Sequence, residues 1–133
     1  MKGKCLGVVV GGVLLLALAS CARDQKLVSI AVQPSAGFVF EGFGAQGQFT
    51  ALGTYIHPPE TKDITGKVVW SLNVANFGTL TQTGKLTYTR TDGCGSGQVT
   101  ATMYSNPANP NVGSVVVASA PVKGALDGST GCQ

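Results

Sequence analysis

The sequence carries little charge, few aromatic residues and a single histidine. Charged residues make up 11% of the 133 residues and aromatic residues 7%. No stretch is basic enough to form a face for nucleic acid, and there is no acidic tail. We therefore expect no nucleic-acid partner.

The groups that carry chemistry are also too scattered to indicate an active site. His57 has no partner near it in the sequence beyond Glu60, and it stands next to two prolines. Residues 42–47 (GFGAQG) match the dinucleotide pattern G-x-G-x-x-G, but a strand pattern follows where that motif needs a helix. We predict no catalytic, cofactor, nucleotide or metal site, and a protein that is not an enzyme. Six carboxylates are spread along the chain, with no calcium-loop spacing among them: Asp24, Glu41, Glu60, Asp63, Asp92 and Asp127.

Long apolar runs are missing too, except at the start of the chain. Two lysines precede an unbroken run of apolar residues and glycine over residues 5–19, which is short for a membrane span and typical of a signal peptide. The run leads into residues 18–21 (LASC), which resemble the lipobox of bacterial lipoproteins. That resemblance implies cleavage after Ser20 and lipid attachment at Cys21; the alternative is an ordinary secretory signal that contains a Cys. Ala22 follows the Cys where some Gram-negative retention signals place Asp, which favours the outer membrane.

Cleavage would leave a nearly neutral chain with two further cysteines. Seven basic residues would face six acidic ones, so membrane attachment is expected from the lipid on Cys21 and not from charge. Cys94 and Cys132 remain as an even pair in an oxidising compartment, and neither has metal-ligand neighbours. We predict a disulfide between them.

The mature chain shows the alternation of short strands and no helical periodicity. Residues 67–72 (KVVWSL) contain the only Trp, and Val68 and Trp70 share one face of an extended strand. Residues 56–65 contain Pro58 and Pro59 and are predicted to form a loop. Strands at intervals of about 8–12 residues predict an all-β antiparallel sandwich of about seven strands, after a helical or apolar signal peptide. The residues that share one face of a strand are Val28, Ile30 and Val32; Phe49, Ala51 and Tyr55; Val68 and Trp70; and Val99, Ala101 and Met103. Among them, seven are predicted to be buried together: Ile30, Phe49, Ala51, Val68, Trp70, Val99 and Ala101.

Six pieces of the mature chain, in their order and spacing, resemble the bacterial immunoglobulin-like domain of group 2 found in intimin-like and invasin-like surface proteins. They are residues 28–34 (VSIAVQP), 47–55 (GQFTALGTY), 63–65 (DIT), 69–71 (VWS), 84–87 (GKLT) and 97–102 (GQVTAT). The resemblance implies an Ig-like sandwich. The two cysteines depart from the family, and the single domain lacks the reach of tandem copies. The predicted organisation is a signal peptide over 1–20, a lipidated linker over 21–26, the sandwich over 27–122, and a tail over 123–133.

These features predict a lipid-anchored, non-enzymatic module of the bacterial cell envelope, with a structural or binding role toward an envelope protein or a cell-surface glycan. Two alternatives remain: an accessory subunit of an envelope transport or secretion complex, and a carbohydrate-binding module that uses Tyr55, Tyr88 and Tyr104. Counting antiparallel strands places the loops around Pro58 and Pro107 at the anchored end, and Cys94 at the opposite end.

Overall fold

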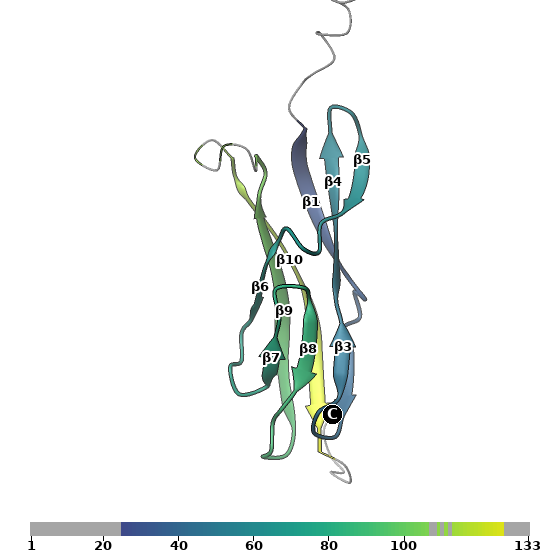
Figure 1. Cartoon of the computed structure of the whole chain (residues 1–133), viewed down its shortest axis with the longest axis vertical. Coiled ribbons are helices and arrows are strands. Elements are labelled where there is room, and N and C mark those ends of the chain that lie inside the picture. Colours follow the sequence, from purple (N-terminus) through teal and green to yellow (C-terminus); the bar gives the residue numbers. More distant parts are fainter. Residues whose placement is uncertain (1–24, 107–108, 110, 112, 127–133) are drawn as a thin grey trace, which may run out of the picture.

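The computed structural model describes residues 25–106, 109, 111, 113–126, and this part of the chain is all-β, with ten strands and no helix (Figure 1). The signal segment, Cys21 and Cys132 lie outside the described residues. The strands are β1 (Lys26–Gln33), β2 (Phe38–Glu41), β3 (Gln46–Gln48), β4 (Thr50–Ile56), β5 (Glu60–Asp63), β6 (Val69–Leu72), β7 (Gly78–Leu80), β8 (Lys85–Tyr88), β9 (Gly95–Tyr104) and β10 (Val115–Ala125).

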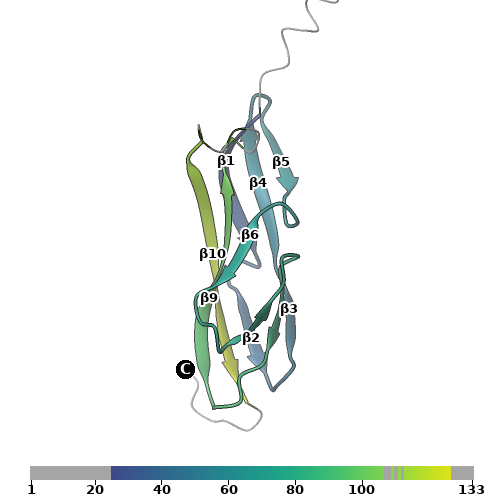
Figure 2. The ribbon, with the colours of Figure 1, turned by 60° about the vertical axis from the view of Figure 1, so that its left-hand side comes forward.

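The ten strands form three sheets arranged as a sandwich. One layer is the four-stranded sheet β2-β10-β9-β6. The sheets β1-β4-β5 and β3-β8-β7 lie opposite it, joined end to end because only Phe49 separates β3 from β4. Figures 1 and 2 both show the long β9–β10 hairpin on one side and β3 and β4 on the other. Every strand pair is antiparallel except β2 with β10.

The core lies between these layers, and Trp70 is part of it as predicted. Its side chain is 3% exposed, its ring lies 6.4 Å from that of Phe49, and its Nε1–H donates to the Thr65 carbonyl at 2.9 Å. A buried indole needs such an acceptor, because an unpaired N–H away from water is costly. All seven residues predicted to be buried together share one cluster: Ile30, Phe49, Ala51, Val68, Trp70, Val99 and Ala101.

The first strand differs from the prediction by one residue at its start. A register shift between Leu27 and Ser29 interrupts the pairing of β1 with β4. Because side chains alternate across a strand, this bulge changes which of its residues face inward. Leu27 is fully buried and Val28 is 45% exposed, so the prediction that Val28 shares one face with Ile30 and Val32 was wrong.

Two other boundaries also differ. The prolines occupy only the turn after β4, and β5 then pairs back along β4, so the predicted loop over 56–65 is in part a strand. β10 runs past residue 122, because residues 122–125 pair with β2. The structure has ten strands where about seven were expected, and six of them are only three or four residues long: β2, β3, β5, β6, β7 and β8.

The two ends of the sandwich are defined by the register. At the end where β1 begins, called the proximal end here, Lys26 pairs with Ile56, and the Leu27 N–H donates to the Ser105 carbonyl at 3.0 Å. At the opposite, distal end, Gly95 pairs with Gly124. The turn after β4 therefore lies at the proximal end and Cys94 at the distal end, as predicted (Figure 1).

Candidate binding surface

Four of the seven large hydrophobic side chains that are exposed in the described residues lie on the outer face of β6, β9 and β10. Val117, Thr102 and Val69 lie side by side across the three strands, and Tyr104 pairs with Val115 in the next row. The three valines are 55–63% exposed, although valine usually points inward. We call Val69, Thr102, Tyr104, Val115 and Val117 the valine patch.

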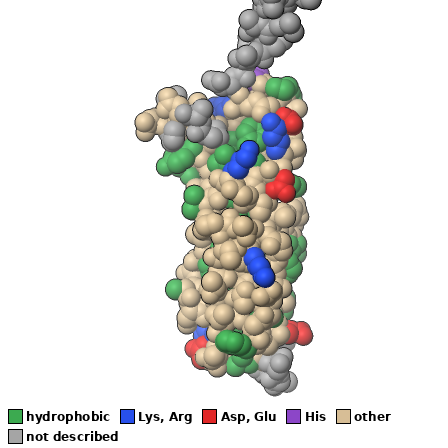
Figure 3. Space-filling model, in the orientation of Figure 1, with side chains coloured by type: hydrophobic (Ala, Val, Ile, Leu, Met, Phe, Trp, Pro, Cys, Tyr) green, Lys and Arg blue, Asp and Glu red, His purple; other side chains and the backbone are tan. Residues whose placement is uncertain are grey.

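The valine patch ends sharply toward the distal end. Ser119, Thr100 and Ser71 form the next row of outward-facing residues, so two rows that hold three valines and a tyrosine give way to a row made only of hydroxyl side chains. The patch therefore occupies only the proximal part of this face. Figure 3 likewise has hydrophobic side chains near the proximal end on the β9–β10 side.

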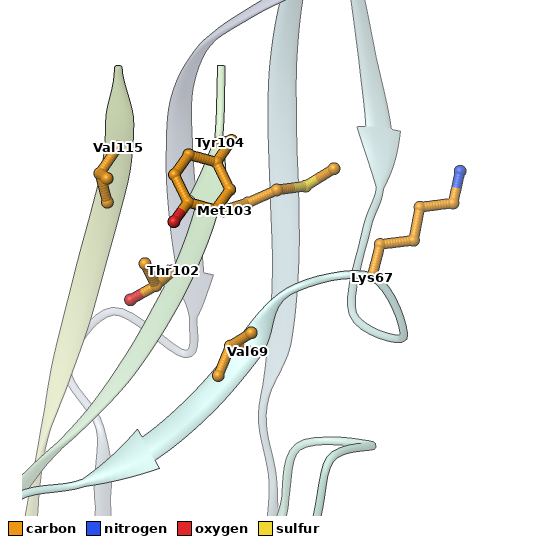
Figure 4. A pocket seen from close by; sticks show the side chains of 6 residues that line it. All are labelled: Lys67, Val69, Thr102, Met103, Tyr104 and Val115. Atoms are coloured by element: carbon orange, nitrogen blue, oxygen red, sulfur yellow. The ribbon is translucent and has the colours of Figure 1, made fainter. Parts of the chain in front are cut away.

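Four residues of the patch, Val69, Thr102, Tyr104 and Val115, line a hollow of about 400 Å³ where β6 leaves β9 (Figure 4). β6 pairs with β9 only from Val69 onward, so Met103 and Tyr104 have no β6 residue beside them. Lys67 stands at the rim, and Met103 extends from β9 toward the opposite layer. A second hollow, of about 420 Å³, lies between the start of β1 and the start of β10 and includes Lys26 and Val28.

The charged residues that line the two hollows are lysines: Lys67 lines the first and Lys26 the second. Lys26 and Lys67 make no ion pair with any residue the structure describes. Glu60 on β5 has two partners. The Gln25 side-chain amide donates a hydrogen bond to the Glu60 carboxylate at 3.0 Å and lowers its pKa, and the Lys62 ammonium, also 3.0 Å from that carboxylate, lowers the pKa further.

Asp63, just after that pair, is held by the turn that follows β5. The Thr65 side chain and backbone N–H both donate to the Asp63 carboxylate, the N–H at 2.9 Å, and these hydrogen bonds lower the pKa of Asp63. Both β5 carboxylates are thus engaged in local structural contacts.

The residues weighed for catalysis or metal binding do not come together. Within the described ranges, no three His, Cys, Asp or Glu side chains are grouped so that they could hold a metal ion. His57 is exposed on the turn between β4 and β5, with a backbone φ of 66°. The glycine-rich segment 42–47 is a turn leading into β3, and Gly42 and Gly44 have φ values of 84° and 85°, which favour glycine.

The three tyrosines do not form a sugar-stacking platform. Tyr88 is completely buried and its hydroxyl donates to the Gly93 carbonyl at 3.2 Å, while Tyr55 is buried on β4. Only Tyr104 is substantially exposed. The tyrosine-based route to carbohydrate binding was therefore wrong, because two of its three rings fill the core.

The distal end has its own exposed apolar side chains. Val39 on the edge strand β2 and Phe43 in the following turn are 71% and 65% exposed. Cys94 is exposed immediately before β9, close to the end of β10, from which the chain continues toward Cys132. The disulfide and the lipidation at Cys21 stay predictions, since each involves a residue outside the described ranges.

Sequence reasoning missed the valine patch, although a signal for it was present. Residues 115–117 (VVV) place valine on both faces of a strand, whereas a half-exposed strand alternates apolar and polar residues.

Comparison of the chain with protein-family models and with curated proteins finds no match. Across the described part of the chain, no helix could cross a membrane. The class of protein is therefore defined by the fold alone, as an all-β sandwich.

Proposed function

We propose that this chain is a lipid-anchored, non-enzymatic Ig-like module of the bacterial cell envelope that binds a partner protein or glycan. The proposal rests on how few residues separate the lipobox-like segment from the first strand. The lipobox-like LASC ends at Cys21, and β1 begins only five residues later, at Lys26. A lipid on Cys21 would hold the proximal end at the membrane, because five residues reach about 17 Å when fully extended.

The distal end is then the part of the module most available to a partner. β9 has 10 residues and β10 has 11. At about 3.3 Å per residue, this hairpin extends roughly 35 Å away from the anchored end. Val39 and Phe43 lie at that far end, and exposed aromatic side chains are frequent anchors in binding interfaces.

The anchor is tested by growing cells with a clickable fatty acid and comparing wild type with Cys21→Ser. The wild type should carry the label and sediment with membranes, while the variant should lose the label. Labelling of the variant would contradict the assignment of Cys21. Recovery in the inner-membrane fraction would contradict the outer-membrane preference alone.

The binding role is tested with a photo-crosslinking residue at Phe43, and with the same residue at Thr79 on the edge strand β7 as a matched control. One stoichiometric partner captured from Phe43 and not from Thr79 supports binding through the distal end. If that partner belongs to a transporter or secretion assembly, the accessory-subunit alternative is correct. A hydrolase or transferase activity that is lost on deletion and restored by the purified protein would contradict the non-enzymatic role.

A further inference from the structure

We infer that the valine patch docks against the lipid surface to which the chain is anchored, so that the sandwich is tilted onto its β6-β9-β10 face and does not stand free on its tether. The inference rests on the proposed lipid anchor. It adds a second membrane contact, made by the folded domain itself.

The position of the patch is the first argument for a lipid partner. Lys26, the first residue of β1, lines the same hollow as Val115 and Val117. The patch is therefore adjacent to the point where the tether enters the fold, and only four residues separate Cys21 from Lys26. At most about 17 Å of extended chain lies between the lipid and β1, so the patch cannot move far from the membrane.

The size of the patch is the second argument. Its two rows are spaced by two residues along the strands, and the hydroxyl row Ser71–Thr100–Ser119 follows. Two residues of strand cover about 7 Å, so the apolar rows are confined to the part of this face nearest the tether. When the face lies against the membrane, these rows contact the boundary between headgroups and acyl chains, and the hydroxyl row lies beside them, farther from the anchored end.

The chemistry of the border is the third argument. Tyr104 combines an apolar ring with a hydroxyl, which is the type of side chain that gathers at membrane interfaces. Lys26 and Lys67 flank the two hollows. Lysines there can extend their ammonium groups to lipid phosphates.

The test uses the lipidated protein reconstituted in vesicles of phosphatidylethanolamine and phosphatidylglycerol whose acyl chains carry bromine near the headgroup. Two variants each place a Trp at an exposed aromatic position: Tyr104→Trp in the patch and Phe43→Trp at the distal end. Trp70 is buried and common to both, so it serves as a shared background. We expect quenching and a blue shift of the added emission for Tyr104→Trp, and neither for Phe43→Trp.

A second pair of variants separates docking from mere proximity. Val69→Thr combined with Val117→Thr keeps β-branched side chains on the strands but adds hydroxyls to the patch, and it should reduce the quenching of Tyr104→Trp. Val39→Thr, made at the distal end, should leave that quenching unchanged.

Three results would overturn the inference, and they are distinguishable from one another. Unquenched Tyr104→Trp in protein that carries the fatty-acid label and stays with the vesicles refutes the docking and leaves the anchor intact. Loss of label and vesicle association refutes the anchor, and the inference falls with it. A blue shift without lipid that grows with protein concentration shows that a second copy of the chain covers the patch.

Discussion

Truncating Trp70 should remove a large part of the stability of the sandwich. The ring is 3% exposed, packs on Phe49 and donates a hydrogen bond to the Thr65 carbonyl. Replacing a buried Trp by Ala typically costs about 3–5 kcal/mol through lost burial and the cavity left behind. Thr65 is only half-buried, so water can reach its carbonyl after truncation, and the lost bond should add little.

That loss is large against the total for a domain of this size, which is about 5–15 kcal/mol. Taking about 2 kcal/mol per molar for the dependence on urea, Trp70→Ala should lower the unfolding midpoint by about 2 M. Trp70→Phe keeps a buried ring, although a smaller one, so we expect an intermediate loss. Circular dichroism in the far ultraviolet is the suitable probe, because the substitution removes the only Trp.

Val69 supplies the matched control on the same strand. It points outward and is 63% exposed, so Val69→Ala should change stability by no more than about 1 kcal/mol. If Trp70→Ala and Val69→Ala unfold at the same urea concentration, the assignment of Trp70 to the core is wrong.

Three further predictions concern packing, pH and the cysteines. Gly124→Ala would place a Cβ against the Tyr88 ring, closer than two carbon atoms can approach, so the melting temperature of the variant should fall clearly. A variant that melts at the wild-type temperature would show that the space between Gly124 and Tyr88 can take a methyl group. The pKa of Asp63 is lowered on folding, so its contribution to stability is present above the unfolded pKa and is lost as pH falls through the lower folded pKa. Asp63→Asn should therefore reduce the loss of unfolding free energy as the pH is lowered. The same loss at acidic pH in the variant and the wild type would contradict the hydrogen bonds from Thr65. In the oxidised mature protein, thiol titration under denaturing, non-reducing conditions should find no free thiol at Cys94; closing a loop of 38 residues should stabilise by about 4 kcal/mol, and a reactive thiol there would end the disulfide prediction.

Much of the core was predictable because it depends on local alternation. In β4, β6 and β9 the apolar residues recur at every second position, and an extended backbone must put them on one face. Phe49, Trp70 and Val99 were therefore assigned correctly before any pairing was known. The single Trp marked the centre because its ring is too large to leave in water without cost.

The candidate surface was not predictable in the same way. Alternation groups Val115 with Val117, but it does not say whether the opposite layer covers their face or the face of Val116. That depends on where β4 and β1 pack, which is a property of the whole fold. The pairing of β5 with β4 was missed for a related reason, since its residues carry no apolar pattern and are held by backbone hydrogen bonds.

The sequence by itself determined the all-β class, the inward faces of the longer central strands and the end of the sandwich at which Cys94 lies. These follow from side-chain periodicity and from the reversal of direction at each turn. Only the tertiary structure decided that a bulge turns Leu27 inward and Val28 outward, that β2 pairs in parallel with β10, and that the outer valines gather beside the start of β1. Each of these depends on which strands become neighbours, and that choice is made by long-range packing energy that no local stretch of sequence contains.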